Sequence, residues 1–108
     1  MKKNVDRMCC GTEVSQSEIE WLDELKGPFF IPEKGFVSDR ETAIRIAEAV
    51  WIQIYGKECI EREKPFRATL VEGIWYVTGT LPGDMEGGVA MAKISQKDGR
   101  IITVIHSQ

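Results

Sequence analysis

The chain has 108 residues, of which 43% are hydrophobic and 29% are charged, and its net charge at pH 7 is −3. This length suits one folded domain, and the apolar fraction can supply a hydrophobic core. The acidic balance argues weakly against nucleic acid or an anionic membrane as partner, because both need clustered basic residues. We therefore expect a single domain over residues 1–108, flexible over 1–16.

The sequence gives no sign of membrane insertion or export. No run of 18 apolar residues occurs, so no membrane-spanning segment is expected. The first residues, MKKNVDRMCCG, are basic at the start but lack the apolar stretch of a secretory signal peptide. We expect a cytoplasmic protein.

A shorter and a longer helix are predicted in the first half of the chain. The shorter covers residues 18–26, with Ser17 as its cap and Gly27 as its stop. The longer covers residues 38–56, SDRETAIRIAEAVWIQIYG, with Ser38 as N-cap and Gly56 as its left-handed stop. Its apolar residues recur with the helical period and predict one buried face: Ile44, Ala47, Trp51 and Ile54, widened by Ala43, Val50 and Tyr55.

Ile52 lies outside this stripe, because it continues the face that carries Glu41, Arg45 and Glu48. A lone exposed apolar side chain is common on protein surfaces. The alternative is that Ile52 contacts a partner protein.

The second half of the chain predicts strands. Residues 59–63 alternate between polar and apolar side chains, which indicates a short edge strand. Glu72-Gly73 predicts a tight hairpin turn. The remaining strands are expected over residues 66–72, 74–81, 89–96 and 101–106.

The last two strands can be given a register. A three-residue loop, Lys97-Asp98-Gly99 with a glycine bulge, places Ala92 opposite Val104 and Ile94 opposite Ile102. This register groups the small and branched apolar residues on the core face. The other face is not purely polar. Either the N-terminal helix or a dimer partner covers it, or it is a binding face. Its residues are Ile74, Tyr76, Thr78, Val89, Met91, Lys93, Ile101, Thr103 and Ile105.

No familiar catalytic or ligand-binding motif occurs. P-loop, G-x-G-x-x-G, G-x-S-x-G and H-E-x-x-H patterns are absent from the sequence. Three cysteines, Cys9, Cys10 and Cys59, and the single His106 do not suggest a disulfide framework or a four-ligand zinc site. Nothing places His106 beside Cys59 as a base. We expect no catalytic, cofactor or metal site.

Several stretches, taken in order and spacing over residues 35–106, resemble the NTF2-fold immunity proteins of bacterial polymorphic toxin systems. They are Phe36-Val37-Ser38-Asp39, Thr42-Ala43-Ile44, Ile46-Ala47-Glu48-Ala49-Val50-Trp51, Ile54-Tyr55-Gly56-Lys57, Lys64-Pro65-Phe66, Gly73-Ile74-Trp75-Tyr76-Val77-Thr78-Gly79-Thr80-Leu81-Pro82, Gly87-Gly88-Val89-Ala90 and Lys97-Asp98-Gly99-Arg100-Ile101-Ile102.

The resemblance implies an α+β fold in which helices pack on a curved antiparallel four-stranded sheet. Two predicted helices are few for an NTF2-like fold, so a cystatin-like arrangement is the structural alternative. The resemblance also implies a non-catalytic protein, a monomer or homodimer, that binds and neutralises a cognate toxin. The functional alternative is a small-ligand-binding protein or enzyme that uses the cavity of the cone.

Exposure and charge suggest which residues would meet the toxin. An acidic patch matches a basic partner and speeds association. The candidate toxin contacts are Ile52, Glu58, Glu61, Glu63, Asp84 and Glu86.

Overall fold

The structure is a computed structural model that describes residues 13–27, 30–81 and 87–107. The chain divides into two units, Met1–Phe30 and Ile31–Gln108, and each is described by itself. The flexibility predicted for residues 1–16 falls mostly on residues 1–12, which lie outside the described part. The prediction of a single domain stays a prediction.

In the described residues of the first unit there is one helix, α1 (Gln16–Glu24). The Ser15 hydroxyl accepts a hydrogen bond from the Glu18 N–H at 3.2 Å, and the Glu18 carboxylate accepts one from the Ser15 N–H at 2.8 Å. This capping box explains why the helix begins before the predicted Ser17 cap. At the other end, the extended residue Leu25 ends the helix before Gly27.

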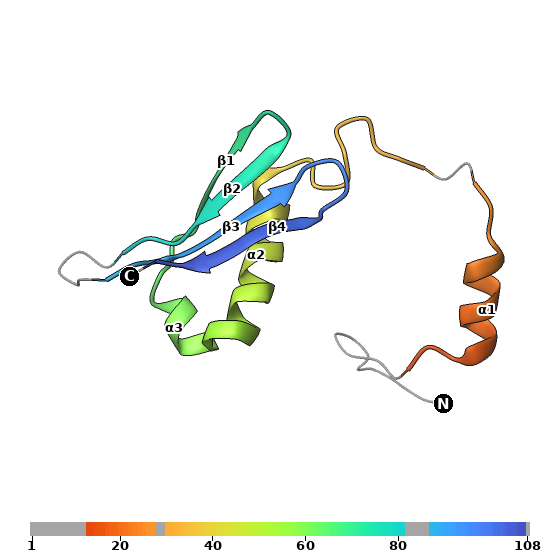
Figure 1. Ribbon diagram of the computed structural model, residues 1–108, viewed down its shortest axis with the longest axis horizontal. Coiled ribbons are helices and arrows are strands. Elements are labelled where there is room, and N and C mark those ends of the chain that lie inside the picture. Colours follow the sequence, from red (N-terminus) through yellow and green to blue (C-terminus); the bar gives the residue numbers. More distant parts are fainter. Residues whose placement is uncertain (1–12, 28–29, 82–86, 108) are drawn as a thin grey trace. The chain divides into compact units, whose positions relative to one another are not determined.

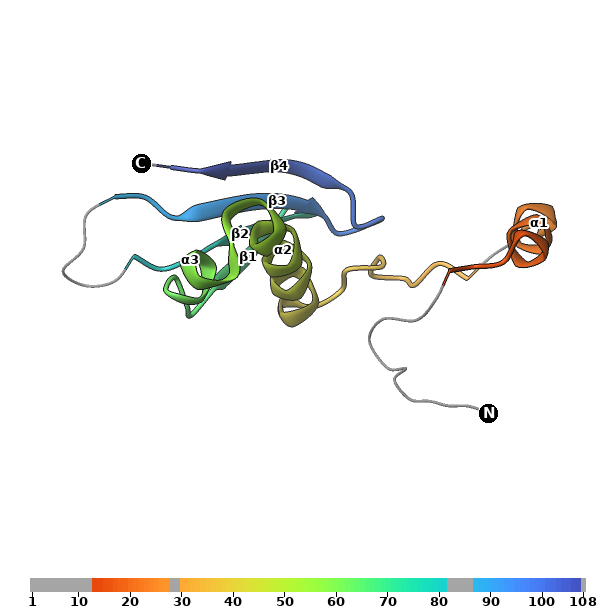
Figure 2. The same cartoon turned by 90° about the horizontal axis from the view of Figure 1, so that it is seen from below.

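The second unit is a helix-on-sheet structure, shown in Figure 1. Its elements are α2 (Arg40–Tyr55), α3 (Lys57–Glu61), β1 (Arg67–Val71), β2 (Ile74–Thr78), β3 (Ala90–Ser95) and β4 (Ile101–His106). The strands follow one another in the order β1-β2-β3-β4, and each neighbouring pair is antiparallel. Helix α2 lies on one face of the sheet and contacts β1, β2 and β3, while α3 contacts α2 (Figure 2). The predicted α+β class with helices on a four-stranded sheet is confirmed.

Helix α2 is capped one residue later than predicted. The Asp39 carboxylate accepts a hydrogen bond from the Thr42 N–H at 2.8 Å, so Asp39 is the N-cap and Ser38 is not. A carboxylate at this position also interacts favourably with the helix dipole. Gly56 ends the helix at φ 95°, as predicted.

The buried face of α2 is rotated from the predicted stripe. Ala43, Ala47 and Trp51 are buried as expected, but Ile54 is 54% exposed and Ile52 packs, partly buried, against the core. The expectation that Ile52 stands on the solvent face is therefore wrong. The chain reverses at Gly56 and α3 packs on α2, which widens the buried side of α2 beyond the residues that face the sheet.

The predicted edge strand at residues 59–63 is wrong, since residues 57–61 form α3. Its Ile60 N–H donates to the Gly56 carbonyl at 3.2 Å, and Ile60 is fully buried. The alternation that suggested a strand also places Cys59 and Glu63 four residues apart, which is a helical spacing. Because Ile60 is fully buried in the core, this segment forms a helix that packs inward and not an exposed edge strand.

Both predicted hairpins are present. Glu72 (φ 50°) and Gly73 (φ 80°) form the two-residue turn, and Val71 pairs with Ile74. In the second hairpin Ala92 faces Val104 as predicted, but Ile94 faces Ile101. The Ser95 N–H donates to the Arg100 carbonyl, so the loop has four residues, 96–99, and the pairing shifts between Lys93 and Ile94.

The core between α2 and the sheet is filled by side chains. Trp51 is 0% exposed, and its ring lies edge-on to Phe66 at a centroid distance of 5.4 Å. The buried Trp75 donates from Nε1 to the Val37 carbonyl at 2.7 Å, which ties the segment before α2 to β2. These two tryptophans fill much of the interior of the second unit. None of the helices in the described part of the chain is long and apolar enough to cross a membrane.

Candidate functional site

The predicted toxin contacts do not share one surface. Glu58 and Glu61 are exposed on α3, whereas Ile52 is partly buried and Glu63 is only 5% exposed. Glu63 therefore cannot be a surface contact, contrary to the expectation. Asp84 and Glu86 lie outside the described residues.

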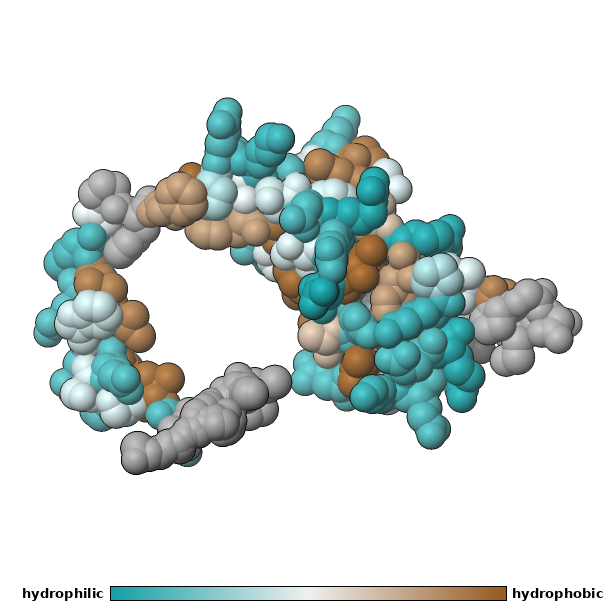
Figure 3. Space-filling view, turned by 180° about the vertical axis from the view of Figure 1, so that it is seen from behind, coloured by the Kyte–Doolittle hydropathy of each residue, from teal (hydrophilic) through white to brown (hydrophobic). Residues whose placement is uncertain are grey.

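Glu58 and Glu61, with Glu48 of α2, form a charged surface that we call the acidic corner. Lys64 Nζ lies 3.1 Å from Glu61 and 3.4 Å from Glu48, and hydrogen bonding to Glu61 holds the pKa of Lys64 above its usual range. Seen from the helix side, hydrophilic side chains cover this region (Figure 3). Such exposed ion pairs contribute little to stability, so they can be exchanged for contacts with a partner.

A second surface lies on the side of the sheet away from α2, and we call it the outer sheet face. In the observed strand register, its residues form two rows that cross β2, β3 and β4. Tyr76 pairs with Lys93, which pairs with Thr103. The neighbouring row consists of Thr78, Met91 and Ile105.

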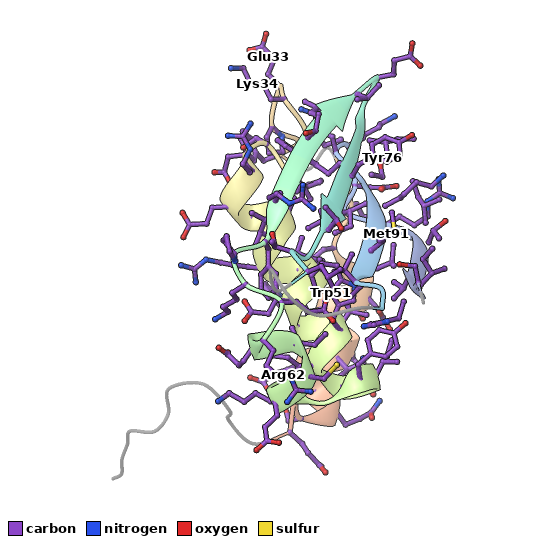
Figure 4. All side chains as sticks on the ribbon, turned by 90° about the vertical axis from the view of Figure 1, so that its left-hand side faces the viewer. Glu33, Lys34, Trp51, Arg62, Tyr76 and Met91 are labelled. Carbon is purple, nitrogen blue, oxygen red and sulfur yellow. The ribbon has the colours of Figure 1, made fainter. Side chains whose placement is uncertain are left out.

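The outer sheet face exposes large apolar side chains. Tyr76 is 43%, Met91 40% and Ile105 48% exposed. Figure 4 shows Tyr76 and Met91 on the side of the sheet opposite the interior Trp51. The six residues line, with Val77 and Ala92, a depression of about 320 Å³. The sequence predicted either a covered face or a binding face here, and the described residues of the second unit leave it open.

The chemistry of the outer sheet face suits a protein partner. Tyrosine and methionine are enriched at the centres of protein interfaces, where charged residues are depleted. Lys93 is the charged residue of the two rows, and its Nζ lies 5.7 Å from the centroid of the Tyr76 ring. An apolar floor with a polar margin marks a site of interaction.

A separate cluster of polar side chains joins α3 to the end of β4. Glu63 Oε2 lies 2.8 Å from His106 Nε2 and 3.9 Å from Cys59 Sγ. Glu63 Oε1 accepts a hydrogen bond from the Ala90 N–H at 2.8 Å. The Tyr55 ring lies 5.0 Å from the His106 ring, centroid to centroid. Three donor atoms, one each from Cys59, Glu63 and His106, lie within 4.8 Å of one another.

This arrangement differs from a nucleophile activated by a base. In such sites the imidazole lies between the thiol and the carboxylate. Here the thiol and the imidazole both point at the same carboxylate oxygen. Three potential metal-ligand atoms that lie this close together instead form an arrangement that could hold a cation.

The sequence pattern does not predict this cluster, because the alternation over residues 59–63 indicates a strand. A helical reading would have placed Cys59 and Glu63 on one side, four residues apart. Their approach to His106, which lies 43 residues after Glu63 in the chain, follows from the sheet topology.

The comparisons with known proteins agree with the fold. Residues 42–108 match the family model of the NTF2 fold immunity proteins. The chain is 33% identical over 76 residues to the uncharacterized protein YhhH of Escherichia coli (strain K12), and this alignment covers 69% of the chain and 60% of YhhH. It is 34% identical over 76 residues to the uncharacterized protein YbbC of the same strain, and this alignment covers 69% of the chain and 62% of YbbC.

The chain thus matches less than two thirds of the length of these two relatives. No solved structure matches the chain. The family match covers α2, α3 and all four strands apart from the first two residues of α2. The chain therefore belongs to the NTF2 fold immunity protein family.

Proposed function

We propose that this is a cytoplasmic immunity protein that neutralises a cognate bacterial toxin by binding it, without catalysis. The match of residues 42–108 to the immunity family carries this proposal. The fold supports it, because its sheet presents an open face of side chains on three adjacent strands. A stoichiometric inhibitor needs only such a complementary surface.

The outer sheet face is the proposed centre of the contact with the toxin. Binding energy concentrates in a few large side chains at the middle of an interface. Met91 lies on β3 between Thr78 and Ile105, and so occupies a central position on this face. The acidic corner, with Glu58 and Glu61, is the proposed site of electrostatic attraction for a basic region of the toxin.

The alternative of a ligand-binding cone finds less support. A small-molecule site needs an apolar cavity with a few converging polar groups. Between α2 and the sheet, that volume is occupied by Trp51, Trp75 and Ile94, each at most 5% exposed.

A binding assay with the toxin encoded beside this protein tests the proposal. The toxin, made harmless by an active-site substitution, is titrated with wild type, Met91→Glu and the control Ala49→Glu. Ala49 is exposed on α2. Burying a new carboxylate in an interface centre should weaken binding by about 100-fold or more, as expected for a hot-spot residue. The control should bind as wild type does.

A charge-reversed pair tests the acidic corner separately. Glu58→Lys with Glu61→Lys should slow association about tenfold and flatten its dependence on salt, with little change in the dissociation rate. Glu33→Lys, an exposed site in the turn before α2, is the control. If the toxin binds neither wild type nor any variant, the proposed function is wrong. If it binds and Met91→Glu has no effect, only the proposed surface is wrong.

A further inference from the structure

The Cys59–Glu63–His106 cluster plays no part in the proposed toxin contact. It lies where α3 meets the end of β4, and Glu63 at its centre is 5% exposed. We propose that this cluster is a zinc site, in which Cys59, Glu63 and His106 are the three protein ligands and a fourth position is open to water. Thiolate, imidazole and carboxylate together are a ligand set that suits zinc.

The distances fit this assignment after a small adjustment. Zinc holds sulfur at about 2.3 Å and nitrogen or oxygen at about 2.0–2.2 Å, so neighbouring ligand atoms in a tetrahedral site lie about 3.3–3.7 Å apart. The three donor atoms already lie within 4.8 Å of one another. Rotations of the Cys59 and His106 side chains that move the donors by about 1 Å would complete the site.

Backbone groups outside the cluster orient two of its ligands. Glu63 Oε1 is held by the Ala90 N–H at 2.8 Å, which leaves Oε2 to face the cluster. His106 Nδ1 lies 3.1 Å from the Ser107 carbonyl. Nδ1 must carry a proton there, because a carbonyl can only accept. Zinc-bound histidines are oriented in this way, with the second ring nitrogen bound to a backbone carbonyl or a carboxylate.

The charges of the proposed ligands match those of the metal. A Zn²⁺ ion bonded to the Cys59 thiolate, the Glu63 carboxylate and the neutral His106 imidazole forms a site without net charge, because the two anionic ligands offset the two positive charges of the ion. The Cys59 thiol gives up its proton to solvent when the ion binds.

The metal would link two parts of the fold. The ion would bond the α3 corner to the last residue of β4, two segments 43 residues apart in sequence. A metal that binds only the folded chain stabilises it by mass action.

Cobalt spectroscopy on the full chain tests the proposal, because Co²⁺ replaces Zn²⁺ and its bond to a thiolate gives a charge-transfer absorption band. Cys9 and Cys10 are replaced by serine in every sample, so that Cys59 is the only thiol. The band should appear with one equivalent of Co²⁺ and disappear on addition of Zn²⁺. Cys59→Ser should abolish it, and His106→Asn should weaken Co²⁺ binding at least about tenfold. The control Glu58→Gln, on the same helix, should behave as the parent does.

A second measurement needs no variant that could misfold. Zn²⁺ should slow alkylation of Cys59 by iodoacetamide, and a chelator should restore the rate. Absence of a thiolate band together with an unchanged alkylation rate would overturn the proposal. So would metal binding that Cys59→Ser and His106→Asn leave unaltered, since the ion would then sit elsewhere. None of these results depends on the toxin.

Discussion

Glu63 links three segments of the second unit through one buried carboxylate. It follows α3, accepts the Ala90 N–H of β3 and pairs with His106 of β4. It also packs against Gly79, where an added Cβ would lie 2.6 Å from Glu63 Oε1. A buried carboxylate with these partners is a structural residue, which its polar character in the sequence did not reveal.

Replacing Glu63 should therefore be costly. Glu63→Ala leaves the Ala90 N–H without its acceptor and the His106 imidazole without its hydrogen-bond partner, and should lower the free energy of unfolding by about 2–4 kcal/mol. Urea denaturation of Glu63→Ala measures this. The control Glu61→Ala removes only an exposed ion pair with Lys64 and should change stability by less than about 0.5 kcal/mol. Equal effects of the two substitutions would show that Glu63 is not buried as described.

The N-cap of α2 gives a second test at the scale of single residues. Hydrogen bonding by the side chain and backbone of Thr42 lowers the pKa of Asp39. Asp39→Ala should lower the melting temperature at neutral pH, whereas Ser38→Ala should leave it nearly unchanged. A larger loss of melting temperature with Ser38→Ala than with Asp39→Ala would show that Ser38 is the cap.

The contribution of Asp39 should also depend on pH in a definite direction. Because its pKa is lower in the folded state, the ionised carboxylate stabilises the fold above the unfolded-state pKa. This stabilisation is lost as the pH falls through the lowered, folded-state value. The difference in melting temperature between wild type and Asp39→Ala should therefore shrink in acid. A difference that grows in acid would contradict this.

At the scale of elements, the segment before α2 is fixed to the turn between β3 and β4. The Phe36 and Val37 N–H groups donate to the Lys97 and Gln96 carbonyls, both at 3.0 Å. Gly35 has φ +87°, and an added Cβ would lie 2.9 Å from the Gln96 carbonyl carbon. This contact connects the start of the helix to the sheet.

A comparison of Gly35 with Gly73 distinguishes the cost of backbone strain from the cost of this close approach. Gly73 also has a positive φ, +80°, but a Cβ there meets nothing within 4 Å. Gly73→Ala should cost about 1 kcal/mol for the strained conformation alone. Gly35→Ala should cost at least about 2 kcal/mol, because the segment must also move away from the turn. Thermal denaturation compares the two, and similar losses would mean that the 35–37 segment is not tightly docked.

Local patterns predicted most of the elements but not their contacts. The α2 pattern, the Glu72-Gly73 turn and the last two strands were predicted because each carries its signal within a few residues. The exchange of Ile52 for Ile54 on the buried side depends on α3 folding back onto α2, which no local pattern contains. For the same reason residues 59–63 were assigned to a strand, and the Cys59–Glu63–His106 cluster was missed.

At the scale of the whole molecule, the acidic corner and the outer sheet face are two different surfaces of the second unit. The acidic corner lies on the helices, and the outer sheet face carries Tyr76, Met91 and Ile105. A second copy of the chain could compete with a toxin for this apolar face. We predict a monomer by light scattering at high concentration; a dimer that Met91→Glu dissociates would instead assign the outer sheet face to self-association.

The most direct test of the central claim is protection of growing cells. The proposed cognate toxin, in its active form, is induced in cells that carry the wild-type protein, the Met91→Glu variant or the Ala49→Glu control, at equal protein levels. We predict growth with wild type and with Ala49→Glu, and loss of protection with Met91→Glu. Death of the cells that contain wild type, with no complex recovered from them, would contradict the account.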